Sequence, residues 1–216
     1  MNIYRTIHER GSDEFTVEKS VFIGHAKPVK TEEEAREFID EMKQKYKDAT
    51  HNVWAYTIGE NMNIQRFSDD GEPSGTAGIP TLEVIKKEDL RDVVVVVTRY
   101  FGGVKLGAGG LVRAYTKGAK IGLEAAKIVE KKPFQEICVD IDYTLLGKIQ
   151  NELSNSEFTI RDIEYTENVR LLIYSELESV EKLKNLLTEI TSANCIISER
   201  EEFYLSVLDG KIIFPE

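Results

Sequence analysis

The pattern of apolar and polar residues predicts a mixed α and β first part of the chain. Strand patterns cover Ile3–Ile7, Glu14–Val17, Val21–Pro28, Asn52–Ile58, Ile64–Ser68 and the uninterrupted apolar run Val93–Thr98. That last run does not alternate, which is typical of a central strand covered on both faces. Helical spacing covers Thr31–Tyr46, where Thr31 and Glu34 form a capping box, and Gly107–Val129. Two helices over one sheet predict a two-layer α/β sandwich.

The second part of the chain predicts a ferredoxin-like unit. Its elements are a strand at Phe134–Ile141, a helix at Leu145–Leu153, strands at Phe158–Tyr165 and Val169–Ser175, a helix at Val180–Ile190 and a strand at Cys195–Val207. The order β-α-β-β-α-β is the ferredoxin-like plan. The chain is therefore predicted to be an α+β protein.

A change in charge supports a division between these two parts. Lys131 and Lys132 precede Pro133, and cations followed by proline are signals that end a helix. Residues 1–133 balance their charges, whereas the rest carries the whole net charge of −10. We therefore expect one domain over residues 1–132 and a second over residues 133–216.

Composition favours a cytoplasmic protein and excludes several classes. No apolar run approaches the ~18 residues of a membrane span, and the N-terminus lacks the plan of a signal peptide. The two cysteines, Cys138 and Cys195, match no metal motif and are predicted to be buried thiols. An acidic chain is unlike a typical nucleic-acid binder, whose whole domain is often basic. We expect no membrane association and no DNA sequence specificity, and the oligomeric state stays open.

The segment Thr98–Arg113 is the sharpest candidate for a binding site. A buried strand ends, five glycines follow within nine residues, and a helix begins. The free N–H groups and partial positive charge of a helix start can hold an anion. The anion or nucleic-acid site is predicted to comprise Lys19, Arg99, Lys105, Gly107, Gly109, Gly110 and Arg113. The alternative is a tight turn whose glycines serve packing alone, because the segment is neither a P-loop nor a dinucleotide fingerprint.

A second candidate lies in the loop Ser68–Pro80, which we expect to pack against the glycine-rich turn. Its acids Asp69, Asp70 and Glu72, with His51, are the candidates for acid–base catalysis. The same acids are a weaker candidate for a divalent cation, since their spacing matches no calcium loop. The alternative for His51 is a histidine that fixes the loop by hydrogen bonds. No nucleophile motif accompanies these residues, and we expect no cofactor and no metal.

Four motifs in this order resemble those of the IMPACT/YigZ family. They are Lys19-Ser-x-Phe, His51-Asn-x-x-Ala-Tyr, Ser68-Asp-Asp-Gly-Glu-Pro-x-Gly-Thr-Ala-Gly-x-Pro80 and Arg99-Tyr-Phe-Gly-Gly-x-Lys-Leu-Gly-x-Gly-Gly-Leu-x-Arg-Ala-Tyr115. The resemblance covers roughly residues 15–125, and the ferredoxin-like tail resembles the C-terminal domain of bacterial members.

The resemblance implies a fold and a general role. The first domain should share the ribosomal-protein-like fold also found in elongation factor G, and the role should be linked to translation. We therefore expect a regulatory or binding protein, rather than an enzyme, that contacts RNA, the ribosome or a translation factor. The alternative is an enzyme acting on a small phosphorylated or peptide substrate through His51 and Asp69, Asp70 or Glu72.

Overall fold

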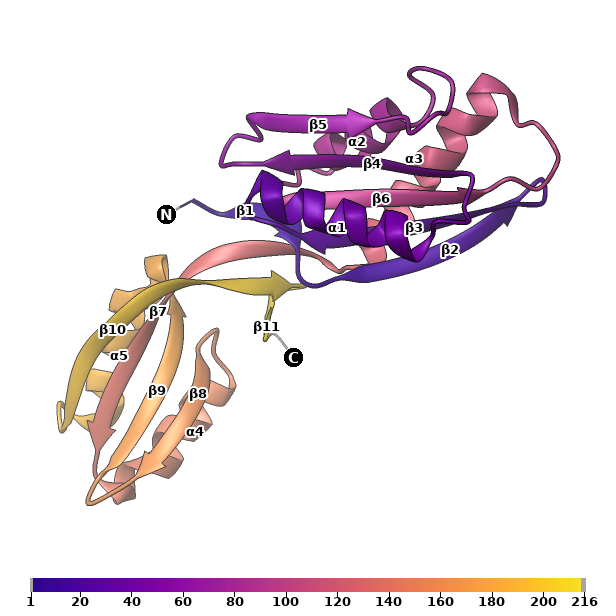
Figure 1. The fold of residues 1–216 in the computed structure, drawn as a ribbon. Coiled ribbons are helices and arrows are strands. Elements are labelled where there is room, and N and C mark those ends of the chain that lie inside the picture. The colour runs from indigo at the N-terminus through magenta and orange to yellow at the C-terminus, as the bar shows by residue number, and fades with distance from the viewer. Residues whose placement is uncertain (1, 215–216) are drawn as a thin grey trace. The chain divides into compact units, whose positions relative to one another are not determined.

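The computed structural model describes residues 2–214, and these form two compact units (Figure 1). The larger unit contains Tyr4–Lys131 together with the segment that begins at Ser206. The smaller unit contains Lys132–Leu205 together with Asn2 and Ile3. The predicted α+β class is confirmed. The prediction that residues 1–132 and 133–216 are separate domains stays a prediction.

The larger unit is built on a sheet with the strand order β2-β3-β6-β4-β5. Its strands are β2 (Gly11–Val17), β3 (Ser20–Pro28), β4 (His51–Ile58), β5 (Ile64–Ser68) and β6 (Val93–Tyr100). A short strand β1 (Tyr4–Ile7) pairs with the first residues of β7 (Ile128–Ile141), and β11 (Lys211–Ile213) pairs with Ser206–Leu208. Strand β6, which contains the apolar run at Val93, is the middle strand of the five, as predicted.

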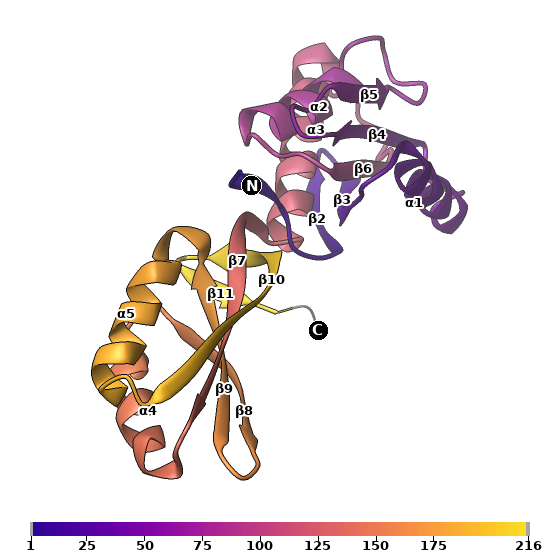
Figure 2. The same cartoon turned by 90° about the vertical axis from the view of Figure 1, so that its left-hand side faces the viewer.

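Helices cover both faces of this sheet, as Figures 1 and 2 show. Helix α1 (Glu32–Lys45) packs on the face that carries Val94 and Val96. Helices α2 (Gly78–Lys87) and α3 (Gly107–Ala125) pack on the face that carries Val93, Val95 and Val97. Successive side chains of a strand point to opposite faces, so each valine of β6 enters one of two cores. The helix α1 thus adds a layer to the expected sandwich.

The structure confirms the predicted start of one helix and corrects the predicted end of another. The predicted cap of α1 is confirmed, because Thr31 Oγ1 accepts from the N–H of Glu34 at 3.2 Å. The predicted helix at Gly107–Val129 is too long: α3 ends at Ala125, and Lys127 turns the chain with a φ of 59°. Lys131 and Pro133 consequently lie inside strand β7 and do not end a helix.

The smaller unit confirms the predicted order of elements. Strand β7 is followed by α4 (Leu146–Ser154), β8 (Thr159–Tyr165), β9 (Val169–Glu176), α5 (Val180–Thr191) and β10 (Cys195–Leu208), with 3-10 turns at Tyr143–Leu145 and Leu177–Ser179. The sheet order is β10-β7-β9-β8. Leucine, isoleucine and valine side chains from this sheet pack against α4 and α5 in one core. Cys138 is buried and Cys195 is half-buried, and both are free thiols.

Candidate functional site

The loop from β6 to α3 is anchored at its base and open at its tip. The N–H of Gly102 donates to Ser20 Oγ at 3.1 Å, and the N–H of Phe101 donates to Thr50 Oγ1 at 3.0 Å. A Cβ on Gly102 would lie 2.0 Å from the carbonyl carbon of Lys19, so only glycine fits there. Within the described part of the chain, nothing lies within 4 Å of a Cβ built on Gly103 or Gly107.

The first turn of α3 is exposed and lacks a side-chain cap. Leu106 occupies the N-cap position and makes no side-chain hydrogen bond to the first turn, and that turn holds no acid. Residues 107–109 are exposed, and Gly107 has a φ of 69°. The first N–H groups of a helix have no partner inside the helix. This helix start therefore presents backbone donors and a partial positive charge to whatever lies outside it.

A first hollow, the basic groove, lies between α3 and the β2–β3 hairpin. It has a volume of about 500 Å³, and its cations are Lys105, Arg113 and Lys117. Among residues 2–214, none of these three has a carboxylate within ion-pair distance. Lys117 Nζ lies 4.4 Å from the centre of the Phe15 ring, which lines the same groove. The groove combines unpaired positive charge with an aromatic surface.

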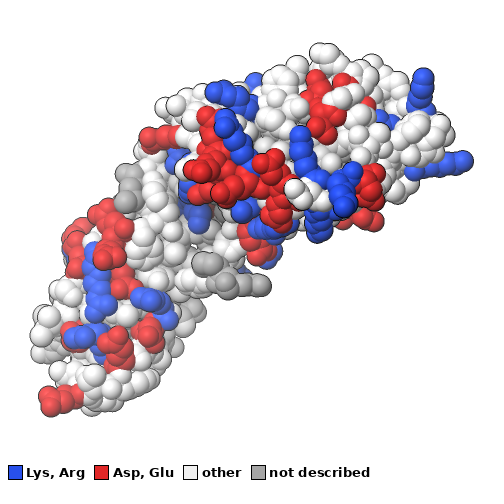
Figure 3. All heavy atoms as spheres, in the orientation of Figure 1, with Lys and Arg blue, Asp and Glu red and all other residues white. Residues whose placement is uncertain are grey.

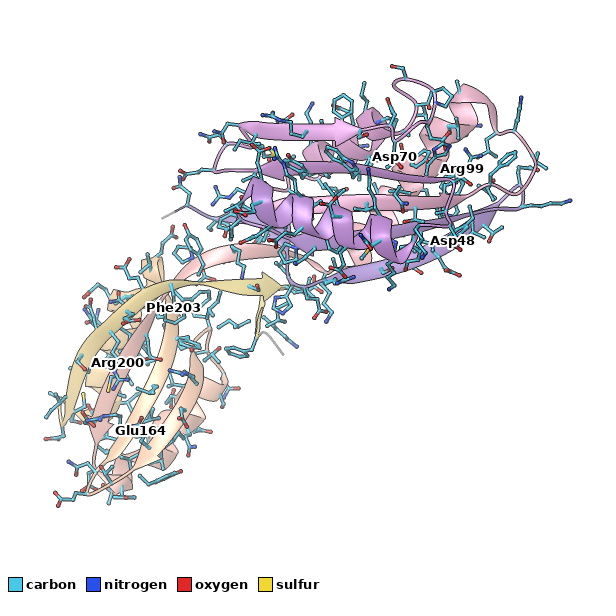
Figure 4. All side chains as sticks on the ribbon, in the orientation of Figure 1. Asp48, Asp70, Arg99, Glu164, Arg200 and Phe203 are labelled. Carbon is cyan, nitrogen blue, oxygen red and sulfur yellow. The ribbon has the colours of Figure 1, made fainter. Side chains whose placement is uncertain are left out.

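A second hollow, the Arg99 pocket, opens on the other side of Lys105 and Leu106. Its volume is about 410 Å³. Its polar lining is Thr50, His51, Glu72, Arg99 and Lys105, and its apolar lining is Pro73, Phe101, Leu106, Ala108 and Leu111. Asp70 and Arg99 lie at the same end of the sheet in Figure 4. The loop 68–80 and the glycine-rich turn thus share one pocket, as expected.

A buried carboxylate organises the polar side of the Arg99 pocket. Glu72 Oε1 accepts from Arg99 Nη1 at 2.6 Å and from the hydroxyl of Tyr115 at 2.7 Å. The side chains of Glu72 and Arg99 are only 4% and 6% exposed. Burial, followed by the hydrogen bond to Glu72, raises the pKa of Tyr115 far above its usual value. Tyr115 therefore stays a neutral donor to the carboxylate.

His51 is held by the backbone of the loop 68–80. Its Nδ1 lies 2.8 Å from the carbonyl oxygen of Asp70, and its Nε2 lies 3.7 Å from Glu72 Oε2. A carbonyl oxygen only accepts, so Nδ1 carries the hydrogen. His51 thus fixes the loop, as the alternative predicted, and it also lines the pocket, while its role in acid–base catalysis stays a prediction.

The other two candidate acids are bound to backbone and to a surface lysine. Asp69 accepts from the N–H groups of Gly75, Ala77 and Gly78 at 2.8–3.1 Å, and thereby caps the start of α2. Asp70 accepts from the N–H of Asn52 at 2.7 Å and pairs with Lys43 Nζ at 3.0 Å. No cluster of three or more metal-ligating acids, histidines or cysteines occurs in the described residues. These bonds leave neither acid facing the Arg99 pocket.

The predicted residues therefore divide between the two hollows. His51, Glu72, Arg99, Lys105 and Gly107 line the Arg99 pocket, whereas Gly110 and Arg113 line the basic groove with Lys105. The expected convergence of Arg99, Lys105 and Arg113 on one place is not found.

Two predicted residues line neither hollow. Lys19 is exposed in the two-residue β2–β3 turn, where Glu18 and Lys19 both have positive φ. Gly109 lies in the first turn of α3, with the Arg113 guanidinium 3.7 Å from the place of its Cβ. Both are close to the site in sequence without lining it.

Two contributing residues were not predicted as part of a site. Lys117 follows Arg113 by four positions, so the helical period alone places both on one face. Tyr115 ends the last of the four family motifs, and nothing in the sequence indicated that its hydroxyl meets Glu72. The spacing was thus a usable signal for Lys117 and not for Tyr115.

Comparisons with known proteins decide the family. The model of the Impact N-terminal domain matches residues 18–123, and that of a domain of unknown function, DUF1949, matches residues 139–194. The chain is 49% identical over 205 residues to the IMPACT family member YvyE of Bacillus subtilis, covering 95% of this chain and 94% of that protein. The chain belongs to the IMPACT family. The predicted resemblance is therefore confirmed.

Other IMPACT family relatives support this assignment at greater distance. The chain is 34% identical to a family member of Haemophilus influenzae, covering 84% of this chain and 89% of that one. It is also 34% identical to YigZ of Escherichia coli, covering 66% and 74%. A crystal structure described as that of a hypothetical protein has a TM-score of 0.58 at 28% identity, covering 93% of this chain and 98% of that one.

The helices add one further finding. Within residues 2–214, no helix is both long enough and apolar enough to cross a lipid bilayer.

Proposed function

We propose that this IMPACT family member binds RNA of the translation apparatus weakly, through the basic groove. The observation that carries the proposal is the set of unpaired cations Lys105, Arg113 and Lys117 around an uncapped helix start. Phosphate groups are bound by lysine, arginine and backbone N–H groups together. A chain of phosphates crossing the groove would meet its lysines and its arginine, and at the end of the groove it would approach the free N–H groups of the helix start.

Some other cations of the larger unit already have carboxylate partners. Arg10 pairs with Glu41 at 2.7 Å, and Lys127 pairs with Glu9 at 2.6 Å. Figure 3 shows Lys and Arg projecting at the end of the larger unit where Figure 1 places the glycine-rich loop. A cation without a carboxylate partner contacts a phosphate without first breaking an ion pair. The groove brings three such cations together in one hollow, and we therefore propose it as the place for a polyanion.

The charge distribution sets the expected strength. Residues 134–216 hold 7 basic and 17 acidic residues, so this part repels a polyanion. Three groove cations neutralise few phosphates, and affinity rises with the number neutralised. Binding is thus expected to be weak and to depend on salt.

The enzyme alternative has less support. Of its four residues, Asp69 and Asp70 bind backbone N–H groups, and only His51 and Glu72 face the Arg99 pocket. We do not propose a reaction for them.

Co-sedimentation with ribosomes tests the proposed function. The full chain is expected to sediment with ribosomes at 50 mM salt and to be released at 200 mM salt, values within the usual range for phosphate-dependent binding. The variant K105A/R113A/K117A should stay in the supernatant at both salt concentrations. The matched variant K47A/K86A/K120A removes the same charge elsewhere on the larger unit and should sediment like the unaltered chain. Equal sedimentation of the two triple variants would overturn the proposal.

A further inference from the structure

A buried donor of the Arg99 pocket has no acceptor in the protein. Arg99 is 5% exposed, and its Nη1 donates to Glu72, yet among the described residues its Nε has no hydrogen-bond partner. More than 90% of buried polar groups in proteins find a partner, so an orphan in a pocket needs an explanation. Arg99 Nε is itself enclosed by protein atoms, so a ligand acceptor would supply the missing bond once a neighbouring side chain moves aside.

Two hydrogen-bond acceptors lie on the same side of the pocket as Arg99. His51 donates from Nδ1 to the Asp70 carbonyl, so Nε2 accepts a hydrogen bond whenever the ring carries a single proton. Glu72 Oε2 lies 3.7 Å from that nitrogen, which is too far for a hydrogen bond. Two acceptors therefore stand side by side, and a ligand N–H placed between them would bind both. The polar side of the pocket therefore fits a ligand that carries a hydrogen-bond donor next to an acceptor.

The rest of the pocket suits a flat ring. Phe101, Leu106, Ala108 and Leu111 give it apolar walls, and Phe101 is 46% exposed and therefore accessible to a ligand. A volume of about 410 Å³ falls within the ~300–1,000 Å³ that is usual for small-molecule sites. Aromatic side chains are the usual stacking partners of unpaired bases.

The lining of the pocket also includes an anion-binding element. Lys105, Gly107 and Ala108 belong to its lining, and the last two begin α3. Backbone N–H groups at an uncapped helix start and a lysine without an ion pair are a suitable pair of partners for one phosphate. The pocket thus joins a site for a ring with polar edges to a site for a phosphate.

We propose that the Arg99 pocket binds a single nucleotide. The base edge presents an N–H to His51 Nε2 and Glu72 Oε2 and an acceptor to Arg99 Nε, while the phosphate lies at Lys105 and the start of α3. The inference rests on the proposed function and extends it from the basic groove to the neighbouring Arg99 pocket, with which the groove shares Lys105 and Leu106. The nucleotide is either a free mononucleotide or an unpaired residue of an RNA strand, since both carry this base and phosphate.

Calorimetric titration of the full chain tests the proposal. The probes are the four nucleoside 5′-monophosphates, the matching nucleosides, inorganic phosphate and single-stranded hexaribonucleotides. Ala108 is exposed and lines the pocket, so A108F fills the pocket without burying a new side chain in the core. R99K keeps the positive charge beside Glu72 and removes the Nε donor. Val112 is an exposed residue of α3 outside the Arg99 pocket, and V112F is the matched control.

At least one mononucleotide is expected to bind more tightly than its nucleoside and more tightly than inorganic phosphate. A108F and R99K should each weaken that binding by roughly tenfold or more, as expected for a lost bond to a charged group. V112F should leave it within about twofold. Binding of hexaribonucleotides alone, weakened by A108F, supports the proposal with RNA as the source.

Two results would overturn the proposal. One is inorganic phosphate binding as tightly as every nucleotide, because the pocket would then recognise the anion alone. The other is oligonucleotide or ribosome binding that A108F leaves intact and K105A/R113A/K117A abolishes. In that case the proposed function would stand and the nucleotide pocket would not. Melting curves of A108F and R99K ensure that a loss of binding is not a loss of fold.

Discussion

Gly24 of β3 and Gly118 of α3 touch through their backbones. A Cβ built on Gly24 would lie 1.9 Å from the carbonyl oxygen of Gly118. Gly118 and Gly122 therefore let α3 lie directly on the sheet. This contact fixes the distance of α3 from β3, and with it the position of both hollows at the start of α3.

The substitution G24A should destabilise the fold. The added methyl group has no space, and overpacking of this kind costs about 1–3 kcal/mol. Urea unfolding should show a lower midpoint than for the unaltered chain. G147A is the matched control, because nothing among the described residues lies within 4 Å of a Cβ at Gly147 in α4. A G24A chain as stable as G147A would contradict the close contact.

The buried pair of Glu72 and Arg99 should be costly to break. The substitution E72Q removes the charge that offsets the Arg99 guanidinium, and an uncompensated buried charge costs about 3–5 kcal/mol. The double variant E72Q/R99M should be less destabilised than the sum of the two single variants, as chemical unfolding can measure. The control is E83Q, whose surface ion pair with Lys86 contributes at most about 1 kcal/mol. Equal effects of E72Q and E83Q would argue against a buried charge pair.

His25 should make stability fall as the pH is lowered. Burial, helped by the charges of Lys45 and Arg10, lowers its pKa to about 4 from 6.5, although Glu41 acts in the opposite direction. The unfolded chain takes up the proton near pH 6.5, whereas the folded chain resists it until about pH 4. The contribution is therefore complete above pH 6.5 and is lost progressively down to pH 4, by about 2 kcal/mol at pH 5.

Comparing the full chain with H25Q isolates this contribution. Urea unfolding at pH 7 and pH 5 should show a smaller loss of stability for H25Q than for the unaltered chain. The ring of His25 accepts or donates only with Ser12 Oγ at Nδ1, and its Nε2 is buried without a partner in the described residues. An identical loss in both chains would show that other groups carry the pH dependence.

The salt dependence of RNA binding should be shallow. Three phosphates at Lys105, Arg113 and Lys117 give a slope of about −2 for log affinity against log salt, at ~0.7 per phosphate for a single strand. The variant R113A/K117A should flatten the slope to about −0.7. Filter binding of a single-stranded RNA over a series of salt concentrations measures both. A slope as steep as that of a large basic surface would place binding elsewhere.

Much of the fold could be predicted because the periodicity is local and strong. The elements of the smaller unit follow the apolar pattern of its sequence to within a few residues. The run of valines that begins at Val93 was predicted to be a central strand, and its alternate side chains are indeed buried in two different cores. The helix α2 was not predicted at all, because Gly78-Ile79-Pro80 at its start is typical of a loop. Proline is tolerated in a first helical turn, and the cap comes from Asp69, nine positions before Gly78.

The errors at α3 and at the site have a similar origin. Ile128 and Val129 continue the apolar spacing of α3, and the turn at Lys127 uses a positive φ without a glycine to announce it. The sequence indicated the loops that form the site, but it did not show that Arg99 and Arg113 line two different hollows. That division depends on the long-range bond between Arg99 and Glu72, 27 positions apart.

The larger unit is built from two segments that are far apart in the sequence, and this affects the order in which it can fold during synthesis. His8 Nδ1 lies 3.0 Å from Ser206 Oγ, and the strand β11 belongs to the same unit as β1. Residues 132–205 leave the ribosome before Ser206 does. The smaller unit can therefore fold while the larger unit still lacks strand β11. Its first 128 residues must persist, during that interval, as an incompletely covered intermediate. A fragment that ends at residue 205 would reproduce this nascent state for study by hydrogen exchange.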